Sequence, residues 1–476
     1  MQLSTKLAYN KQTLSKRLPI GKSFDIVGRD FNIGNISAYL LFIDGFVKDQ
    51  ILLFIIERLQ NLSINKLNSE DIKKLIQKEI AYIEITTFNN FEDMETPLLS
   101  GAVALFVDTQ DKGIILDVRE YPVRGPQEPD LEKVTRGPRD GLVETIIFNT
   151  ALIRRRVRDP NLIFEITNVG TQSRSDVAIG YIDNVVDHEL LKQIKDKLNN
   201  INVNALVMAE KTLAELLIDK KWYNPLPQIR FTERPDVVAA HLYEGHIALI
   251  VDTSPSVMLL PVTIFHFTQH AEDYYQYPMV GTYLKWIRFI AMFLAFIMTP
   301  LWLFLVYNVD KLPSFLQFIG PKKSSSIPLL LQFIILEFGI DFLRLASIHT
   351  PNALTTPMGI IGGLLLGNLA VQVGWFVPET ILYMAIAGIG TFASPCIEFG
   401  MAIRMFRLFL LVLTGLFKNI GFVTGIIIIS IIVCTTKTFG KHSYLWPLIP
   451  FDKSAFLNVF LRRPIPEMSK RKSTKQ

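Results

Sequence analysis

Three ionisable residues share one otherwise apolar stretch in the C-terminal half of the sequence. Glu337, Asp341 and Arg344 lie at i, i+4 and i+7 within residues 327–348, so one face of a helix would carry all three. Charged groups inside a membrane span are costly, face the protein interior or water, and by default mark ion or proton pathways. The stripe therefore lines or gates a cation path, or it is a fixed charge cluster that locks helices together.

The spacing also predicts how these charges pair. Arg344 lies one turn from Asp341 and would neutralise it. That leaves Glu337 as the free carboxylate, and a ring of such carboxylates in an oligomer attracts cations. Glu337 is therefore the leading pore candidate of the three.

A fourth candidate lies in the last apolar stretch, residues 404–437, which is too long for one simple spanning helix. The polar run Lys418-Asn-Ile-Gly421 interrupts its middle. We expect two half-helices around this run. Broken backbone persists at membrane depth only where it is buried in protein or lines water, which makes Lys418 a pore or gate candidate.

Catalytic and cofactor motifs are missing from the sequence. It contains no GxxxxGK[ST], no HExxH, no GxSxG and no strand followed by GxGxxG. His266 and His270 have a spacing that metal ligands use, but such pairs are more often polar residues near a membrane interface. Cys396 and Cys434 both lie in apolar stretches, which supports neither a disulfide scaffold nor a zinc cluster. We expect no enzyme activity, no cofactor and no metal.

A segment rich in Pro, Gly and Arg follows residue 119. Its prolines restrict the chain, and its arginines can pair with its acids within or between protomers. We expect an ordered junction loop and a helix over residues 121–157, ending in Arg154, Arg155 and Arg156, where cations suit the helix dipole. The charged residues of this junction are Glu120, Arg124, Glu128, Arg136, Arg139 and Asp140.

The elements that position these residues fall into two regions. Residues 1–283 carry most of the charge, whereas residues 284–436 carry very little, as in a soluble region joined to a membrane region. The net charge is +5, and no basic stripe runs through the soluble part, so nucleic-acid binding is not expected.

The soluble region alternates apolar strands with helical patterns, which predicts two small α/β subdomains. We expect a flexible arm at 1–20, one subdomain at 21–120 and a second at 158–283. Strands at 102–108 and 247–252 both end in apolar-Val-Asp, which hints that the two subdomains are related.

The region 284–437 reads as an α-helical polytopic membrane domain. Gly359, Gly363 and Gly367 form a ridge of small residues that favours close helix packing, with a hinge as the alternative. The stretches long enough to span a bilayer are 284–307, 327–348, 357–378, 379–397 and 404–437.

Basic residues set the expected orientation. Lys285 and Arg288 begin the first span, and the tail at 438–476 is strongly basic. We therefore place the soluble region and the tail on the cytoplasmic side. An even number of crossings is then required, which is consistent with a broken segment at 404–437.

Three strings of residues resemble a known family. They are Arg119-Glu120-Tyr-Pro-Val-Arg124-Gly-Pro-Gln-Glu128-Pro, then Arg136-Gly-Pro-Arg139-Asp140-Gly, then Asn149-Thr-Ala-Leu-Ile-Arg154-Arg155-Arg156. Together they closely resemble the motif of GerA-type spore germination proteins, the A-subunit family. The segment from Ala346 to Pro395 is most similar to the SpoVAF-like branch, and the resemblance covers residues 24–460.

This resemblance implies a multi-pass protein of the spore inner membrane that acts in germination. It further implies a homo-oligomer, as a pentamer, that releases monovalent cations as a channel beside other germination membrane proteins. SpoVAF-like chains lack the nutrient-sensing partner subunit of the nutrient receptors, so direct nutrient sensing is not implied. Two alternatives stay open: a non-conducting scaffold, and a secondary transporter, which broken helices and intramembrane charges also fit.

Overall fold

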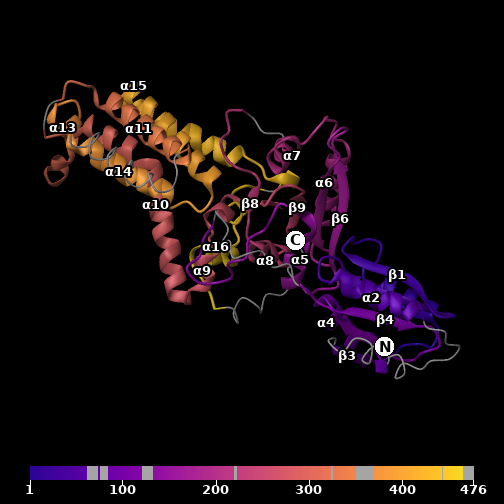
Figure 1. Ribbon diagram of the computed structural model, residues 1–476. Coiled ribbons are helices and arrows are strands. Elements are labelled where there is room, and N and C mark those ends of the chain that lie inside the picture. Colours follow the sequence, from indigo (N-terminus) through magenta and orange to yellow (C-terminus); the bar gives the residue numbers. More distant parts are fainter. Residues whose placement is uncertain are drawn as a thin grey trace. The chain divides into compact units, whose positions relative to one another are not determined.

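The computed structural model of the chain consists of two compact units (Figure 1). The first comprises Met1–Asp219 with Ile229–Pro261, and the second comprises Lys220–Gln228 with Val262–Gln476. The last change from the first unit to the second follows Pro261. The boundary between a soluble and a membrane region at residue 283 stays a prediction. The residues described are 1–61, 73–74, 84–120, 132–218, 222–322, 325–349, 369–441 and 443–464.

The first subdomain is built on a five-stranded antiparallel sheet with the order β1-β2-β4-β5-β3. Successive residues of its central strands face opposite sides. Leu40 packs with α2 (Asp49–Gln60), whereas Leu41 packs with α4 (Phe91–Leu99) and with α1 (Leu7–Arg17). Helices therefore cover both faces of the sheet. Its strands are β1 Ile26–Ile33, β2 Ile36–Ile43, β3 Glu84–Phe88, β4 Val103–Val107 and β5 Gly113–Asp117.

Helix α1 (Leu7–Arg17) corrects the expectation of a flexible arm at residues 1–20. Leu7 and Leu14 are buried in the core of the first subdomain. The backbone N–H of Leu7 donates to Oδ1 of Asp108 over 2.9 Å. The arm was predicted because the segment is polar, but two leucines two turns apart are enough to hold it against the sheet.

The second subdomain repeats the first. Its antiparallel sheet has the order β6-β7-β9-β10-β8, so both sheets read 1-2-4-5-3 when each is numbered along the chain. This confirms the predicted relation between the two subdomains. The elements are α5 Ile146–Arg156, β6 Leu162–Val169, β7 Ser175–Ile182, α6 His188–Asn199, α7 Ala209–Leu217, β8 Arg230–Thr232, α8 Pro235–Tyr243, β9 Ile247–Val251 and β10 Val257–Leu260.

The repeat extends to single hydrogen bonds. Asp252 follows β9 as Asp108 follows β4, and its Oδ1 accepts the N–H of Ile146, the first residue of α5, over 3.1 Å. An acidic side chain thus holds the N-terminus of the leading helix in both copies, where it suits the helix dipole. Two further pairs match: Asn10 with Asn149, each bonding the backbone six residues earlier, and Thr109 with Thr253, at φ 68° and 67°.

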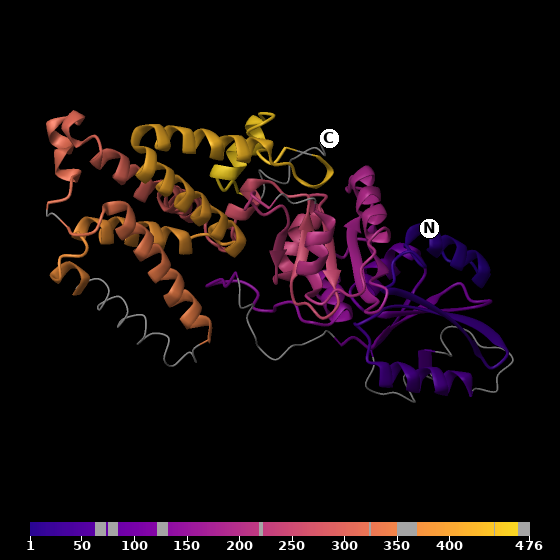
Figure 2. The same cartoon turned by 90° about the horizontal axis from the view of Figure 1, so that it is seen from above.

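The second unit is mainly helical. Helices α10, α11, α14 and α15 lie side by side (Figures 1 and 2). Among the described residues, α10 and α15 are long and apolar enough to cross a membrane, by length and composition. The helices are α9 Glu272–Tyr275, α10 Pro278–Val306, α11 Leu329–His349, α13 Ala370–Gln372, α14 Pro378–Phe392, α15 Ile397–Thr435 and α16 Lys453–Phe460, with 3-10 turns at Ile264–Thr268, Val309–Lys311, Ser314–Ile319 and Phe439–Lys441. The glycine ridge predicted at 359–367 lies outside the described residues.

Helix α15 reverses direction at Lys418, whose φ of 52° and ψ of −126° are not helical. A Cβ built on Gly421 would lie 1.9 Å from the backbone oxygen of Leu413. In a continuous helix these residues would be about 12 Å apart. The segment is therefore a hairpin of two helices, 397–417 and 419–435, and the predicted break at Lys418 is confirmed.

The position of the break differs from the prediction. The side chains of Asn308 and Asn419 exchange hydrogen bonds of 2.5 and 2.8 Å. Asn308 lies just beyond the C-terminal end of α10. The hairpin tip is therefore level with the end of α10 rather than midway along it, because each arm is nearly as long as a spanning helix.

Candidate functional site

Glu337 is buried in α11, with 3% of its surface exposed. Its Oε1 accepts hydrogen bonds from Arg404 Nε at 2.8 Å and from Arg407 Nη2 at 2.7 Å. Arg404 also donates through Nη2 to the backbone oxygen of Glu337, at 2.7 Å. One carboxylate oxygen is therefore shared by two guanidinium groups from α15.

The expected pairing of charges along α11 is wrong. Asp341 accepts a hydrogen bond from Arg404 Nη1, whereas Nη1 of Arg344 lies 2.6 Å from Sδ of Met401. Glu337 is not a free carboxylate, because α15 packs against α11 and presents its arginines to the acids. Pairing by spacing along one helix could not foresee a donor on another helix.

Arg407 connects four helices. It is 1% exposed. Its Nη1 donates to the backbone oxygens of Ala295 in α10, at 2.7 Å, and Ala387 in α14, at 3.1 Å. Nη1 also lies 3.2 Å from Thr391 Oγ1, while Nη2 holds Glu337. This one side chain thus contacts α10, α11, α14 and its own α15.

The sequence analysis missed Arg404 and Arg407. The available signal was two arginines three residues apart in an apolar stretch, which places both on one helical face. We name the group of Glu337, Asp341, Arg404 and Arg407 the charge cluster. Its two carboxylates and two guanidinium groups balance, so it carries no net charge when all four are ionised.

Lys418 lies apart from the charge cluster. It is exposed at the hairpin tip, and its Nζ is 5.9 Å from the centroid of the Tyr307 ring. Eleven helical positions separate it from Arg407, which corresponds to about 16 Å along the axis. The structure therefore does not join the four pore candidates predicted from the sequence into one site.

The junction loop is only partly described, since Arg124 and Glu128 lie outside the described residues. Arg136 and Arg139 are exposed, and so is Glu120. Asp140 was expected to pair with an arginine of the loop. Its carboxylate instead accepts hydrogen bonds from Arg156 Nη2 in α5, at 2.6 and 2.7 Å. The loop acid thus binds the helix that follows it.

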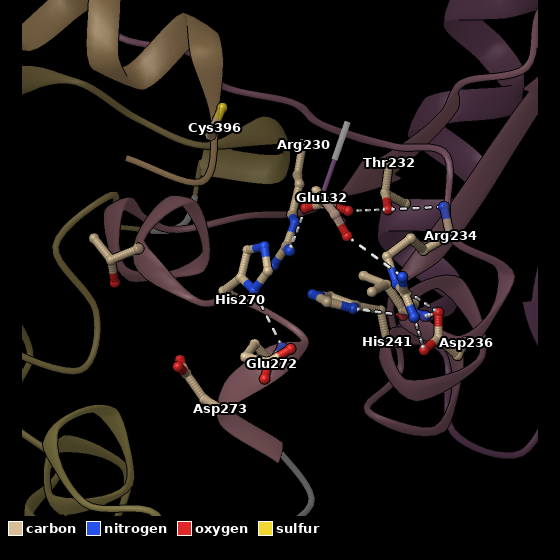
Figure 3. A network of polar contacts seen from close by, with 12 residues as sticks. Glu132, Arg230, Thr232, Arg234, Asp236, His241, His270, Glu272, Asp273 and Cys396 are labelled. Atoms are coloured by element: carbon tan, nitrogen blue, oxygen red, sulfur yellow. Dashed lines mark hydrogen bonds and ion pairs between the residues drawn. The ribbon is translucent and has the colours of Figure 1, made fainter. Parts of the chain in front are cut away.

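A second polar network holds the end of the junction loop on the second subdomain (Figure 3). Glu132 accepts from Arg230 Nη2 at 2.9 Å and from Thr232 Oγ1 at 2.6 Å. Arg234 donates to the backbone oxygens of Glu132 and Pro138, at 3.3 and 3.2 Å. These contacts are those of an ordered loop, and the sequence did not indicate that β8 and α8 would supply them.

Arg154, in the last turn of α5, forms a buried ion pair in addition to placing a cation at the end of that helix. It is fully buried, and its Nε and Nη2 hold the carboxylate of Asp25 at 2.8 and 3.0 Å. Ser23 Oγ donates to the same carboxylate at 2.5 Å and accepts the N–H of Phe164 in β6 at 2.9 Å. Because Asp25 precedes β1, this buried ion pair joins the two subdomains of the first unit.

His266 and His270, whose spacing metal ligands also use, both make local contacts. His266 Nδ1 accepts the N–H of Thr263 at 3.0 Å, and His270 Nδ1 accepts the N–H of Glu272 at 3.1 Å. Within the described ranges, no three His, Cys, Asp or Glu side chains gather as a metal site would require.

These features define a class of protein: a duplicated α/β region followed by an apolar helical unit with a buried charge cluster. The chain belongs to the GerA family, since residues 12–474 match the family described as Bacillus/Clostridium GerA spore germination protein.

Curated relatives span nearly the whole chain. Stage V sporulation protein AF of Bacillus subtilis (strain 168) is 40% identical over 96% of this chain and 93% of the relative, in agreement with the branch expected from the sequence. Spore germination protein B1 of the same organism is 25% identical over 99% of this chain and 97% of the relative. Among solved structures, the N-terminal domain of the A subunit of the Bacillus megaterium spore germinant receptor GerK3 is 27% identical, with a TM-score of 0.43, covering 54% of this chain and 96% of that one.

Proposed function

We propose that this chain is a multi-pass subunit of an oligomeric cation-release channel in the spore inner membrane, and that the charge cluster is its gate. The observation that carries the proposal is Arg407, through which one buried charge ties four helices of an apolar unit together. Family membership supports a role in germination. The soluble region would face the spore core, with a homopentamer and other germination membrane proteins as the assembly.

The geometry favours a gate over a pore lining. A lining carboxylate must be free to attract cations, but Glu337 is held by two arginines. A gate, in contrast, needs an element with two arrangements and a modest energy difference between them. Separating α11 from α15 would take Glu337 away from Arg404 and Arg407 and Asp341 away from Arg404, which would convert a neutral cluster into exposed acids beside the path.

Potassium flux from liposomes that contain the purified full chain tests the proposal. Asp341→Asn removes one of the bonds made by Arg404 but leaves Glu337 paired, so it should raise the resting flux several-fold at equal protein content. Glu379→Gln, a charge change at the start of α14, is the matched control. Flux no greater than in empty liposomes for intact oligomers of both the wild type and Asp341→Asn would instead favour the non-conducting scaffold.

A further inference from the structure

A second charged group lies where α10 begins, away from the charge cluster. Asp273, which is fully buried, accepts from Arg288 Nη1 and Nη2 at 2.6 and 2.8 Å. Lys285 is 3% exposed, and the charged groups that act on it are Asp273, Arg288 and Arg462. Lys285, Arg288 and Arg462 therefore lie near the carboxylate of Asp273, and Arg288 already binds both oxygens of that carboxylate.

Arg288 is satisfied by Asp273 and by the backbone oxygen of Thr268, but Lys285 and Arg462 keep N–H groups for which the described residues offer no good acceptor. Lys285 Nζ has three hydrogens, and its hydrogen bond goes to the backbone oxygen of Asn458, at a long 3.4 Å. Arg462 donates through Nη2 to the backbone oxygen of Tyr274 at 2.8 Å, while its buried Nε has no partner among the residues that the structure describes. Buried donors without acceptors are costly, so this corner is suited to an anionic ligand.

The surroundings indicate what kind of anion. Tyr277 and Met279 are 79% and 86% exposed at the start of α10, and Tyr283 and Trp286 follow on the next turns. Exposed aromatic rings of this kind are typical of the headgroup layer of a bilayer. Helix α10 has 29 residues, about 44 Å, whereas a bilayer core is about 30 Å thick, so its first turns extend into that layer.

Helix α16 closes the other side of this corner. Phe460 packs against Phe289 and Trp286 of α10, with ring centroids 4.9 and 5.8 Å apart. The backbone N–H of Arg462 donates to Thr282 Oγ1 at 3.1 Å, which fixes the arginine beside Lys285. The cations are therefore held in place by packing before any ligand arrives.

We infer that the corner formed by Lys285, Arg288 and Arg462 binds the phosphate of an anionic glycerophospholipid, with Tyr283 and Trp286 against the acyl chains. The inference rests on the proposed membrane insertion. A lipid is the occupant because the excess of positive charge and the exposed aromatic rings occur at the same level of α10.

Native mass spectrometry of the full chain, released from nanodiscs of phosphatidylcholine with phosphatidylglycerol, tests this inference. The wild type should retain phosphatidylglycerol in preference to phosphatidylcholine. Lys285→Met and Arg462→Gln should each weaken that preference about fivefold, the effect of one cation near an anionic headgroup. Arg462→Lys should keep it, and so should Lys311→Gln, which removes a cation beyond the other end of α10.

Flotation with phosphatidylcholine vesicles separates this inference from the proposed function. A chain that floats but shows no preference for phosphatidylglycerol, or whose Lys285→Met and Arg462→Gln variants keep the preference while still folded, would overturn the lipid site alone. If Lys285→Met fails to fold, the comparison of Arg462→Gln with Arg462→Lys decides. A chain that does not float would overturn membrane insertion, and the lipid site with it.

Discussion

Arg404 is the arginine of the charge cluster that binds both of its acids, whereas Arg407 binds Glu337. It donates to Glu337, to the backbone oxygen of that residue and to Asp341. A buried acid that loses its partner costs about 3–5 kcal/mol, far more than the net contribution of an intact pair. Removing one member of the cluster should therefore lower the stability of the protein by more than the net contribution of the intact pair.

Arg404→Ala should lower the thermal unfolding temperature of the detergent-solubilised chain much more than Arg344→Ala. Arg404 serves two acids, whereas Arg344 is partly exposed and contacts Met401. The expected difference is about 1.5–3 kcal/mol, the contribution of hydrogen bonds to charged groups, because Glu337 keeps Arg407 and Asp341 is partly exposed. The two variants truncate the same side chain on facing helices, so equal losses would contradict the pairing described here.

Sequence reasoning located the acids of this cluster but not their partners. An ionisable group in an apolar stretch must find a buried environment, which is how Glu337 could be selected. Its partners Arg404 and Arg407 lie 67 and 70 positions further along the chain. Local spacing rules reach only three or four positions, so a partner on another helix becomes visible only when the helices are packed.

At the scale of elements, the hairpin of α15 depends on small residues near its tip. Gly421 lies against the backbone of Leu413, and Gly425 faces the side chain of Leu410 across the two arms. A side chain at either glycine would push the arms apart. The polar run around Lys418 indicated a break in the sequence, but the exact reversal depends on this close contact between arms.

Gly421→Ala should destabilise the chain more than Gly388→Ala. The Cβ of the first would lie 1.9 Å from a backbone oxygen, which cannot move without displacing its helix, whereas the Cβ of the second would meet Ile340 Cδ1 at an ordinary 3.4 Å. Overpacking of this kind costs about 1–3 kcal/mol. Thermal unfolding of both variants measures it, and an unchanged midpoint in Gly421→Ala would rule out the tight hairpin.

The leading helix of each subdomain shows where element prediction from sequence fails. Helix α5 was expected, because its apolar residues and terminal arginines mark it. Helix α1 was not, although it occupies the equivalent place in the first subdomain. Its N-terminal contact is Asp108, 101 positions away in sequence. A polar helix that is held by a distant side chain leaves almost no local pattern.

For the molecule as a whole, the hairpin fixes where α15 lies along α10. Phe399 stacks on Phe267, just ahead of α10, with ring centroids 5.9 Å apart. Arg407 meets Ala295 within α10, and Asn419 meets Asn308 at its end. Both ends of α15 therefore lie near the start of α10, and the tip lies at the far end.

Cysteine labelling of intact cells tests this arrangement, in a background without Cys396 and Cys434. In the proposed topology, Lys418→Cys should react with an impermeant maleimide from outside. Gln110→Cys, in the turn between β4 and β5 of the first subdomain, should react only after permeabilisation. Each arm of the hairpin, about 31 and 25 Å long, is close to the thickness of a bilayer core. Labelling of both sites from the same side would exclude a hairpin that spans the membrane.

The contact between α16 and α10 has a consequence for the order of synthesis. A ribosome completes α10 long before it reaches Phe460 and Arg462, whose partners Phe289 and Thr282 are then already in place. The start of α10 therefore stays incompletely packed until α16 and Arg462 have been translated. Chains released before residue 453 should be the ones that quality-control proteases recognise at this corner.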